Sequence, residues 1–329
     1  MKESEIRPAD IFKRYLELSA ADAERHFKND ERVSIPCVAC GSKDLSPEFR
    51  KLGFSYSTCN NCRTLFQTPR PSVDAFEGFY RDSISSRYWA ETFFPAVAEA
   101  RREKIFKPRV ERLAALCAER GLIPRSLVDV GAGYGIFLEE WRRILPETSL
   151  LAIEPSVNLA QTCRGHGFDV VQDIVENVTG YENSSDLVVC FEVLEHAYDP
   201  VALIKSLARL AKPGGYVFVS TLGVDGFDIQ TLWDRSDSIS PPHHINFLSI
   251  PGFEAAFARA GLVDVGITTP GKLDVDIVRN AFRRDAAVLK DSRFAKFIVE
   301  DDERGALFQT FLASHQMSSH VWVLARKPG

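Results

Sequence analysis

The sequence contains no long apolar run, and segments such as DLVVCF at 186–191 are far too short to cross a bilayer. The opening MKESEIRPAD has no apolar signal region, so we expect a cytoplasmic protein whose thiols stay reduced. Positive charge is not in excess, because the formal net charge is −5. That charge gives no electrostatic reason to expect nucleic acid or an anionic membrane as a partner. Internal repeats and low-complexity tracts are also missing.

The second half of the chain alternates between short apolar segments and amphipathic ones. Strands are predicted at 126–130, 149–153, 168–171, 185–190, 215–220, 262–268 and 319–326, and helices at 135–145, 156–166, 199–211 and 251–260. Such alternation predicts an α/β fold, with a seven-stranded, mostly parallel, Rossmann-like sheet covered by helices on both faces.

Composition divides the 329 residues into four segments. We expect a helical arm over 1–30, a small cysteine-rich unit over 31–72, a helical cap or linker over 73–121 and the Rossmann-like domain over 122–329. The stretch TPRPS at 68–72 marks the boundary after the cysteine-rich unit. Within the last segment, residues 270–318 are predicted to form a helical insertion before the final strand.

The turn VDVGAGYGI lacks the third glycine of a dinucleotide-binding fingerprint, since Ile136 stands where G-x-G-x-x-G requires it. The pattern is instead D-x-G-x-G-x-G, led by Asp129. A strand enters this turn and a helix leaves it, with its N-terminal N–H groups aimed into the crevice at the sheet's edge. Glu154 ends the next strand, where a carboxylate can accept two hydrogen bonds from ribose hydroxyls. A nicotinamide cofactor is therefore disfavoured.

Five stretches in order resemble class I S-adenosylmethionine-dependent methyltransferases: VDVGAGYG, LLAIEP, VVQDIVEN, DLVVCFEVLEHAYDP and LAKPGGYVFVST. The resemblance covers roughly residues 120 to 268 and the final strand. It implies S-adenosyl-L-methionine as cofactor, with Glu154 on the ribose and Asp173 facing the adenine amine. The cofactor-binding residues that it implies are Asp129, Gly131, Ala132, Gly133, Tyr134, Gly135, Glu154, Pro155, Asp173, Ile174, Phe191 and Glu192. A nucleotide-binding or degenerate α/β domain is the alternative.

Two C-x2-C pairs separated by eighteen residues fit a four-thiolate zinc ribbon. The predicted ligands are Cys37, Cys40, Cys59 and Cys62. Four thiolates leave no open position for a substrate, so we expect a structural ion that supplies folding energy to a unit too small for a full core. The alternatives are a redox pair, which needs only one C-x2-C in a βαβ context, or free buried thiols. The other cysteines, at 117, 163 and 190, are expected to be packing residues.

The ribbon and the core together resemble the zinc-containing bacterial methyltransferases that act on nucleotide-linked deoxysugars or related glycans, over about residues 35 to 268. This resemblance implies a small-molecule or glycan acceptor, such as a nucleotide-linked sugar. Members that methylate carbon carry a long C-terminal domain, whereas only about 50 residues here separate the sixth and last strands. Methylation at carbon, oxygen or nitrogen therefore stays open, as does the oligomeric state.

Two adjacent histidines in SPPHHINFL, His243 and His244, follow the fifth strand. Histidine titrates near neutrality and suits a general base. The sugar C-methyltransferases carry Glu-His and then an aromatic residue here, so His244 would match that histidine, His243 replaces the glutamate and Phe247 supplies the aromatic ring. The resemblance also places Tyr80 where these enzymes have a functional tyrosine. We expect His244 to be the base; the alternative is a loop-organising pair bonded to the backbone.

A second group, Glu192, Glu195 and His196, falls at i, i+3 and i+4 in FEVLEHAYDP. It is similar to the metal-binding residues of small-RNA 2′-O-methyltransferases and of some ubiquinone-pathway O-methyltransferases. That likeness implies a magnesium or zinc ion completed by His243 or His244. The other interpretation, which we favour, is a pocket wall without metal.

Several residues outside these motifs are weaker candidates. Tyr88 and Trp89 either cover the cofactor pocket or pack between ribbon and core. Arg101 and Arg102 either bind a diphosphate or lie on a solvated helix face. The loop after the fifth strand offers Asp225, Asp228, Trp233 and Asp234 for the acceptor pocket. Two other functions also remain open: a zinc-ribbon binding protein on an inactive scaffold, and an RNA methyltransferase.

Overall fold

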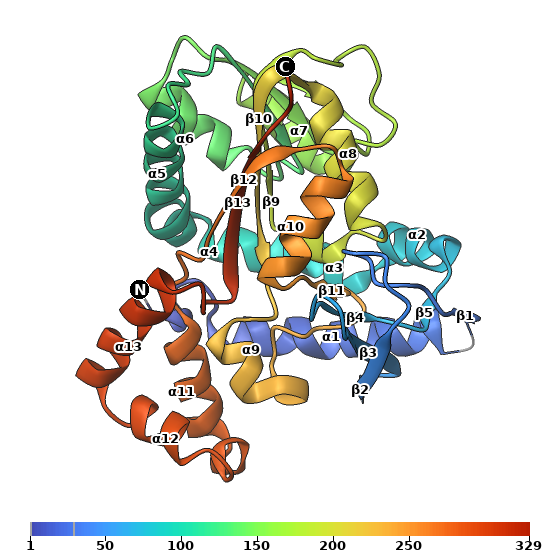
Figure 1. Cartoon of the computed structure of the whole chain (residues 1–329), viewed down its shortest axis with the longest axis vertical. Coiled ribbons are helices and arrows are strands. Elements are labelled where there is room, and N and C mark those ends of the chain that lie inside the picture. The colour runs from blue at the N-terminus through green and yellow to red at the C-terminus, as the bar shows by residue number, and fades with distance from the viewer. Residues whose placement is uncertain (1, 29) are drawn as a thin grey trace.

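The computed structural model describes residues 2–28 and 30–329 and centres on a seven-stranded sheet in the order β12-β13-β10-β9-β6-β7-β8 (Figure 1). The strands are β6 (Ser126–Val130), β7 (Ser149–Ile153), β8 (Asp169–Val171), β9 (Ser185–Phe191), β10 (Ala211–Leu222), β12 (Val263–Thr268) and β13 (His320–Arg326). Only β13 is antiparallel to its neighbours, β10 and β12. The predicted α/β fold with a mostly parallel sheet is confirmed.

Helices cover both faces of this sheet, because successive strand side chains point to opposite sides. The helices are α5 (Lys107–Ala118), α6 (Ile136–Ile144) and α7 (Val157–Gly165) on one face, and α8 (Pro200–Leu210) and α10 (Ile250–Arg259) on the other. Within β6, the Leu127 side chain packs on the face covered by α5, α6 and α7, and the Val128 side chain packs on the face covered by α8 and α10. Both faces of the strand are thus buried, which explains its continuous apolar sequence.

Strand and helix positions agree with the sequence prediction except at β10, which begins four residues earlier, at Ala211. The register with β9 shifts between Ala211 and Tyr216, and Gly214 lies there at φ +78°. Apolar periodicity cannot reveal a strand that starts across the sequence KPGG, because prolines and glycines are typical of turns.

A second sheet has four strands in the order β11-β4-β3-β2. Three come from the cysteine-rich unit: β2 (Leu45–Lys51), β3 (Phe54–Cys59) and β4 (Leu65–Gln67). The fourth, β11 (Asn246–Phe247), comes from the segment that follows the histidine pair. A short ladder of β1 (Arg32–Val33) and β5 (Arg70–Pro71) closes the unit. The histidine-bearing loop is therefore part of the ribbon's own sheet.

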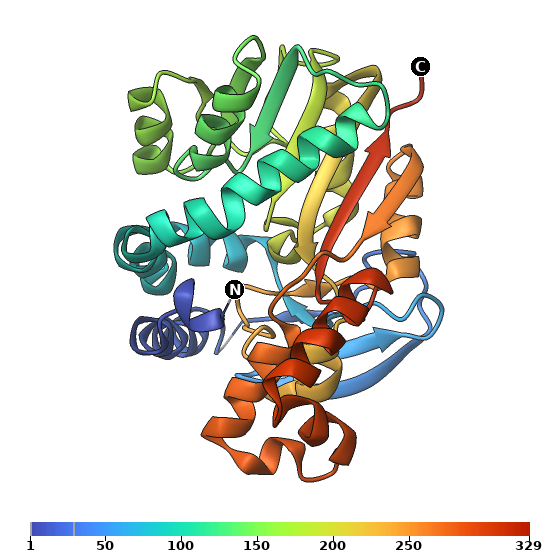
Figure 2. The same ribbon diagram turned by 90° about the vertical axis from the view of Figure 1, so that its left-hand side faces the viewer.

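The remaining helices gather at one end of the central sheet, opposite the C-terminus (Figures 1 and 2). They are η1 (Glu3–Glu5), α1 (Ala9–Phe27), α2 (Val73–Asp82), α3 (Ile84–Tyr88), η2 (Trp89–Phe93), α4 (Phe94–Arg101), η3 (Arg102–Phe106), η4 (Leu194–His196), α9 (Phe227–Leu232), η5 (Trp233–Arg235), α11 (Asp274–Arg284), η6 (Ala286–Leu289), α12 (Arg293–Val299) and α13 (Asp302–Ser314). The segment 270–318 is largely helical, as expected. No helix in the described part of the chain is long and apolar enough to cross a membrane.

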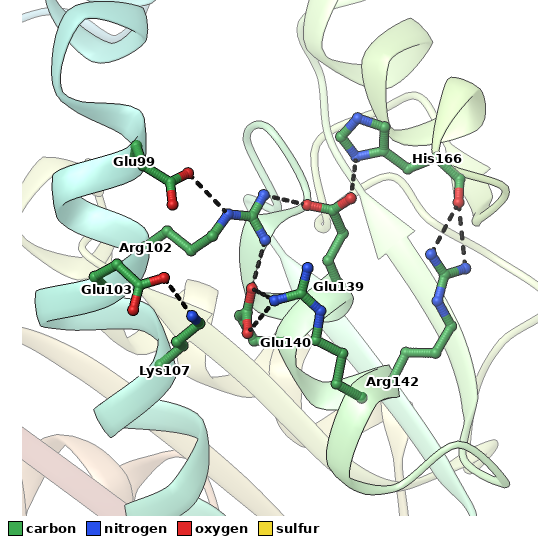
Figure 3. A network of polar contacts seen from close by, with 9 residues as sticks. Glu99, Arg102, Glu103, Lys107, Glu139, Glu140, Arg142 and His166 are labelled. Atoms are coloured by element: carbon green, nitrogen blue, oxygen red, sulfur yellow. Dashed lines mark hydrogen bonds and ion pairs between the residues drawn. The ribbon is translucent and has the colours of Figure 1, made fainter.

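An ion network joins the helices before the sheet to α6, the helix that follows the glycine turn (Figure 3). Arg102 pairs with Glu139 and Glu140 of α6, and Glu139 also contacts His166. Only 18% of the Arg102 side chain and 4% of the Glu140 side chain are exposed. Burial makes such paired charges costly to break. The network therefore fastens the helical cap to the element that begins at the predicted cofactor turn.

Candidate active site

A large cavity of about 1290 Å³ lies at the carboxyl ends of β6, β7 and β9. Pockets for one small ligand usually measure about 300–1,000 Å³, so this one has room for two molecules. All but one of the predicted cofactor residues line it: Asp129, Gly131, Ala132, Gly133, Tyr134, Glu154, Pro155, Asp173, Ile174, Phe191 and Glu192. The exception, Gly135, precedes α6 at φ +72°. A Cβ atom there would lie 3.2 Å from Cys163 Sγ, so this glycine serves packing behind the cavity.

The glycine turn brings bare backbone to the cavity wall. Gly131 and Gly133 have φ values of +74° and +56°, in the left-handed region that favours glycine. A Cβ atom on Gly131 would lie 2.9 Å from Val193 Cγ2. Around Gly133 a Cβ atom would meet nothing within 4 Å. The turn therefore leaves open space beside the backbone, as a bound nucleoside requires.

Two acids of the cofactor motifs, Glu154 and Asp129, lie buried beside the turn. Glu154 accepts hydrogen bonds from the backbone N–H groups of Gly133 at 2.8 Å and Ser156 at 2.9 Å. Burial raises the pKa of Glu154 and, together with the charge of Glu154, raises the pKa of Asp129 to about 8. Asp129 Oδ1 is buried without a hydrogen-bond partner in the described residues. An orphaned acceptor and an open turn fit S-adenosylmethionine, the cofactor that these motifs imply.

Asp173 lies at the rim of the same cavity, where its Oδ1 accepts hydrogen bonds from the N–H of Ile174 at 2.8 Å and from Asn177 at 3.0 Å. The second oxygen of the carboxylate is left for a ligand, which is compatible with the predicted contact to an adenine amine.

Glu192 directly follows β9 and has a strained backbone, at φ +55°. Its carboxylate accepts hydrogen bonds from Ser220 at 2.6 Å, Arg109 at 2.9 Å and His320 at 3.0 Å. Burial would raise its pKa, but His320 and Arg109 hold the pKa well below its ordinary value. Glu192 is thus an ionised residue committed to partners on α5, β10 and β13. It does not join the potential metal ligands, which are Glu195, His196 and His244.

His244 presents an unprotonated nitrogen. Its Nδ1 lies 2.6 Å from the carbonyl oxygen of Ser238, and a carbonyl can only accept, so Nδ1 carries the proton. The Nε2 atom therefore keeps its lone pair. Burial lowers the pKa of His244 to about 4, which keeps the ring neutral near pH 7. His196 is arranged alike, with Nδ1 3.0 Å from the carbonyl of His243.

His243 has the opposite arrangement. Its Nε2 lies 2.8 Å from Ser85 Oγ, and that hydroxyl donates its only proton to Asp22 at 2.6 Å. Nε2 of His243 must then be the donor to Ser85. The ring also packs against Phe79, with centroids 5.0 Å apart. Burial lowers its pKa to about 3. This histidine organises the loop, as one of the two sequence interpretations holds.

The ribbon fixes the backbone of the same loop. Tyr56 donates a hydrogen bond to the carbonyl of His244 at 2.7 Å, and the N–H of Gln67 donates to the carbonyl of Ile245 at 2.9 Å. Lys51 donates to the carbonyl of Ser236 at 2.7 Å. The position of His244 therefore depends on β3 and β4, more than 170 residues earlier in the chain.

The four predicted zinc ligands come together beneath this loop. Their sulfur atoms all lie within 4.8 Å of one another, with Cys37 and Cys62, and Cys40 and Cys59, 3.5 Å apart. A tetrahedral ion with Zn–S bonds of about 2.3 Å would place its sulfurs roughly 3.8 Å apart, so the donor set fits zinc. Each cysteine pair is followed by a residue with a positive φ angle, Gly41 after the first pair and Arg63 after the second. The cysteines at 117, 163 and 190 are buried packing residues, as predicted.

The aromatic candidates differ in position. Tyr80 borders the cavity with 43% of its surface exposed, and its ring centroid lies 6.4 Å from that of His243. Trp89 stacks on Phe93 at 4.1 Å while one side borders the cavity, and Tyr88 packs in the same cluster.

The loop acids and Trp233 were weak candidates, and the cavity wall does not include them. The lining contains none of Asp225, Asp228, Trp233 and Asp234, among the described residues. Asp228 is instead fully buried beside Asp274.

Three parts of the cavity wall were not predicted from the sequence, or were predicted only as one of two alternatives. The arm contributes Arg7 and Tyr15, and the cap contributes Arg101. The third part is residues 270–273 together with Asp274, the first residue of α11. Arg101 and Arg102 are neighbours with different roles, since Arg102 joins the network with α6 and Arg101 faces the cavity. A helix places adjacent residues about 100° apart, so a charge run alone could not tell them apart.

The fold and the site together define a Rossmann-like methyltransferase domain. A family profile described as a methyltransferase domain matches residues 97–266, which is more than half of the chain. The chain belongs to this family.

Individual curated relatives align with only about half of this chain. The ubiquinone biosynthesis O-methyltransferase of Proteus mirabilis (strain HI4320) is 33% identical over 164 residues, covering 46% of this chain and 61% of the relative. The protein of the same name from Klebsiella pneumoniae subsp. pneumoniae is 33% identical over 168 residues, covering 47% and 64%. The chain thus spans less than two thirds of these relatives. An O-methyltransferase family protein from Burkholderia thailandensis has a TM-score of 0.48 and 16% identity, covering 74% of this chain and 62% of that one.

Proposed function

We propose that the chain is an S-adenosylmethionine-dependent methyltransferase that methylates a carbon or oxygen of a small molecule, with His244 as general base. The bound cofactor supplies the electrophilic methyl group and the leaving group. One observation carries the proposal: a neutral imidazole with a free Nε2 lines the same cavity as the glycine turn and Glu154.

The protein's residues then have separate tasks. Glu154 accepts hydrogen bonds from ribose hydroxyls, and Asp173 faces the adenine amine. His244 Nε2 removes a proton from the acceptor, and the Ser238 carbonyl stabilises the ring that becomes charged. The pKa of about 4 makes His244 a weak base in the free protein. An acceptor that carries negative charge would raise this pKa toward neutrality and improve proton transfer.

For the acceptor we propose a sugar, linked to a nucleotide. The combination of the cysteine ribbon with the methyltransferase core supports this class, and the volume of the cavity suits a ligand of that size beside the cofactor. The names of the curated relatives favour oxygen as the methylated atom.

The test is a transfer assay with isotopically labelled S-adenosylmethionine and a panel of nucleotide-linked sugars. His244→Gln should lower turnover by about 10²- to 10⁴-fold, the usual contribution of a general base. Its affinity for S-adenosylhomocysteine should stay within about twofold of the wild type. The matched control is His315→Gln, because His315 is exposed on the helical insertion. Near wild-type turnover in His244→Gln would remove this residue from the mechanism. An inactive scaffold predicts no S-adenosylhomocysteine binding at all.

A metal-assisted O-methyltransferase is the second candidate. Ligand atoms of Glu195, His196 and His244 lie within 4.8 Å of one another. Burial and the charge of Glu192 raise the pKa of Glu195 to about 8, so a bound cation would be needed to keep it ionised at neutral pH. In this mechanism His244 is a ligand instead of the base. Chelation should then abolish turnover, and magnesium should restore it while the zinc content stays constant. Unchanged turnover after chelation would exclude this candidate.

A further inference from the structure

Arg7 and Arg101 are two cavity arginines without a close counter-ion. The only ion pair of Arg7 in the described chain is with Glu3, at the limiting distance of 4.0 Å. Arg101 has no ion pair in residues 2–28 and 30–329, and its closest aromatic contact is the ring of Phe94, 5.5 Å away. Nε of each arginine is buried and makes no hydrogen bond within the described residues. Each arginine therefore has a buried Nε–H donor that a ligand can satisfy.

Two other cations of the cavity wall are paired, whereas Arg87, Arg112 and Lys272 also line it without an ion pair in the described residues. Arg109 is paired with Glu192, and Lys104 with Glu5. Glu154 accepts two backbone hydrogen bonds beside the glycine turn. Arg101 also experiences repulsion from Arg7 and Arg109, which together with burial lowers its pKa to about 10. Among the cavity cations without a close carboxylate partner, Arg7 and Arg101 are the two whose Nε is buried and makes no hydrogen bond within the described residues.

The cofactor brings no net negative charge to the cavity. S-adenosylmethionine carries a sulfonium, an ammonium and one carboxylate, so its net charge is positive and it would add to the repulsion. A ligand that occupies the cavity beside the cofactor must therefore bring the anion. Two guanidinium groups complement a doubly charged group such as a phosphoryl or diphosphate, which they can bind in a bidentate manner.

Arg7 also lies near the proposed base. Arg7 lies over the ring of Phe12 at 5.3 Å, and Phe12 packs on Tyr15. The ring centroid of Tyr15 lies 5.6 Å from that of His243. Phe94, which Arg101 contacts, stacks on Tyr134 of the glycine turn with centroids 4.7 Å apart. Arg101 therefore lies on the side of the cofactor turn and Arg7 on the side of the histidine loop, and both border the cavity in which an acceptor has to be held.

We infer that Arg7 and Arg101 form an anion-binding subsite that holds the phosphoryl or diphosphate group of the methyl acceptor. The inference rests on the proposed function, because it assigns this group to the acceptor. Both residues are positioning residues for the acceptor and take no part in proton removal.

The test is calorimetric titration of inorganic pyrophosphate into the protein saturated with S-adenosylhomocysteine. Wild type should bind pyrophosphate, and Arg101→Met and Arg7→Met should each bind it on the order of tenfold or more weakly. Arg14→Met removes the same charge from the exposed surface of α1 and should bind pyrophosphate like the wild type. Two variants on different segments guard against a folding defect in one of them. Arg101→Lys should restore binding in part, because it keeps charge without the planar fork.

Three results would overturn the subsite. The first is that wild type and Arg101→Met bind pyrophosphate with equal affinity. The second is that the wild type binds no pyrophosphate, and the third is that it binds acetate more tightly than pyrophosphate. A loss of S-adenosylhomocysteine affinity in Arg101→Met would also overturn it, because Arg101 would then hold the cofactor's own carboxylate. Failure of the proposed function is distinguishable: wild-type protein would bind no S-adenosylhomocysteine, whatever pyrophosphate does.

Discussion

The two halves of the cavity are built in different ways. The cofactor half comes from consecutive strand ends of one sheet, where the glycine turn and Glu154 lie 19 residues apart at their closest. The acceptor half is assembled from the arm, the cap and the loop of His244, and the ribbon holds the backbone of that loop. The first half follows from the sheet itself, whereas the second exists only when four separate segments pack together. The halves should therefore respond differently to the same kind of disturbance.

The largest effect is expected from Cys59→Ser. Loss of one thiolate should release the zinc and lower the free energy of unfolding by several kcal/mol, since a structural zinc contributes up to about 10–16 kcal/mol in small domains. Methyl transfer should disappear because β11 and His244 lose their support. Metal analysis, thermal unfolding and turnover measure these changes. Cys117→Ser, a buried cysteine outside the ribbon, is the control and should retain zinc.

If the zinc content of Cys59→Ser equalled that of the wild type, the four-thiolate site would be wrong. If a zinc-free variant kept full turnover, the His244 loop would not depend on the ribbon. The proposed difference between the two halves of the cavity would then be wrong.

A smaller effect is expected from Asp22→Asn. Asp22 accepts hydrogen bonds from Ser85, which in turn holds His243, so the arm orients the histidine loop through this chain. Removing the charge should cost about 1.5–3 kcal/mol of stability, the range for hydrogen bonds to charged groups. Turnover should fall while S-adenosylhomocysteine affinity stays constant. Asp10→Asn on the exposed side of α1 provides the matched control. Equal turnover in both variants would show that the arm does not orient the loop.

The smallest effect concerns pH. Asp228 and Asp274 are buried together, and burial with the neighbouring charge raises the pKa of Asp228 well above its ordinary value. The folded protein then binds a proton that the unfolded chain releases, so its stability is greatest below the unfolded pKa and falls as pH rises through the folded one. Asp228→Asn mimics the protonated acid and should flatten this decline in thermal unfolding measured across pH. An equally steep decline in the variant would contradict this assignment.

Sequence alone predicted the cofactor half because its signals are local. A glycine turn, the strand before it and the acid ending the next strand lie within about 30 residues, and strand pairing brings them together automatically. The paired cysteines were predictable for the same reason. In each case the spacing of a few residues already fixes the chemistry.

The acceptor half was predictable only in part. His244 was identified by resemblance, but its tautomer depends on the Ser238 carbonyl, and its backbone position depends on Tyr56. The two-residue strand β11 is too short for any alternation pattern. Arg7 lies in the N-terminal arm without a motif. Such contacts join segments far apart in the chain, and no local periodicity encodes them.

The most direct measurement is calorimetric titration of S-adenosylhomocysteine into wild type, Glu154→Ala and His244→Gln. The wild type should bind one ligand per chain, Glu154→Ala about tenfold to a hundredfold more weakly, and His244→Gln with unchanged affinity. A wild type that binds no S-adenosylhomocysteine, or a Glu154→Ala variant that binds it normally, would contradict the assignment of the two halves.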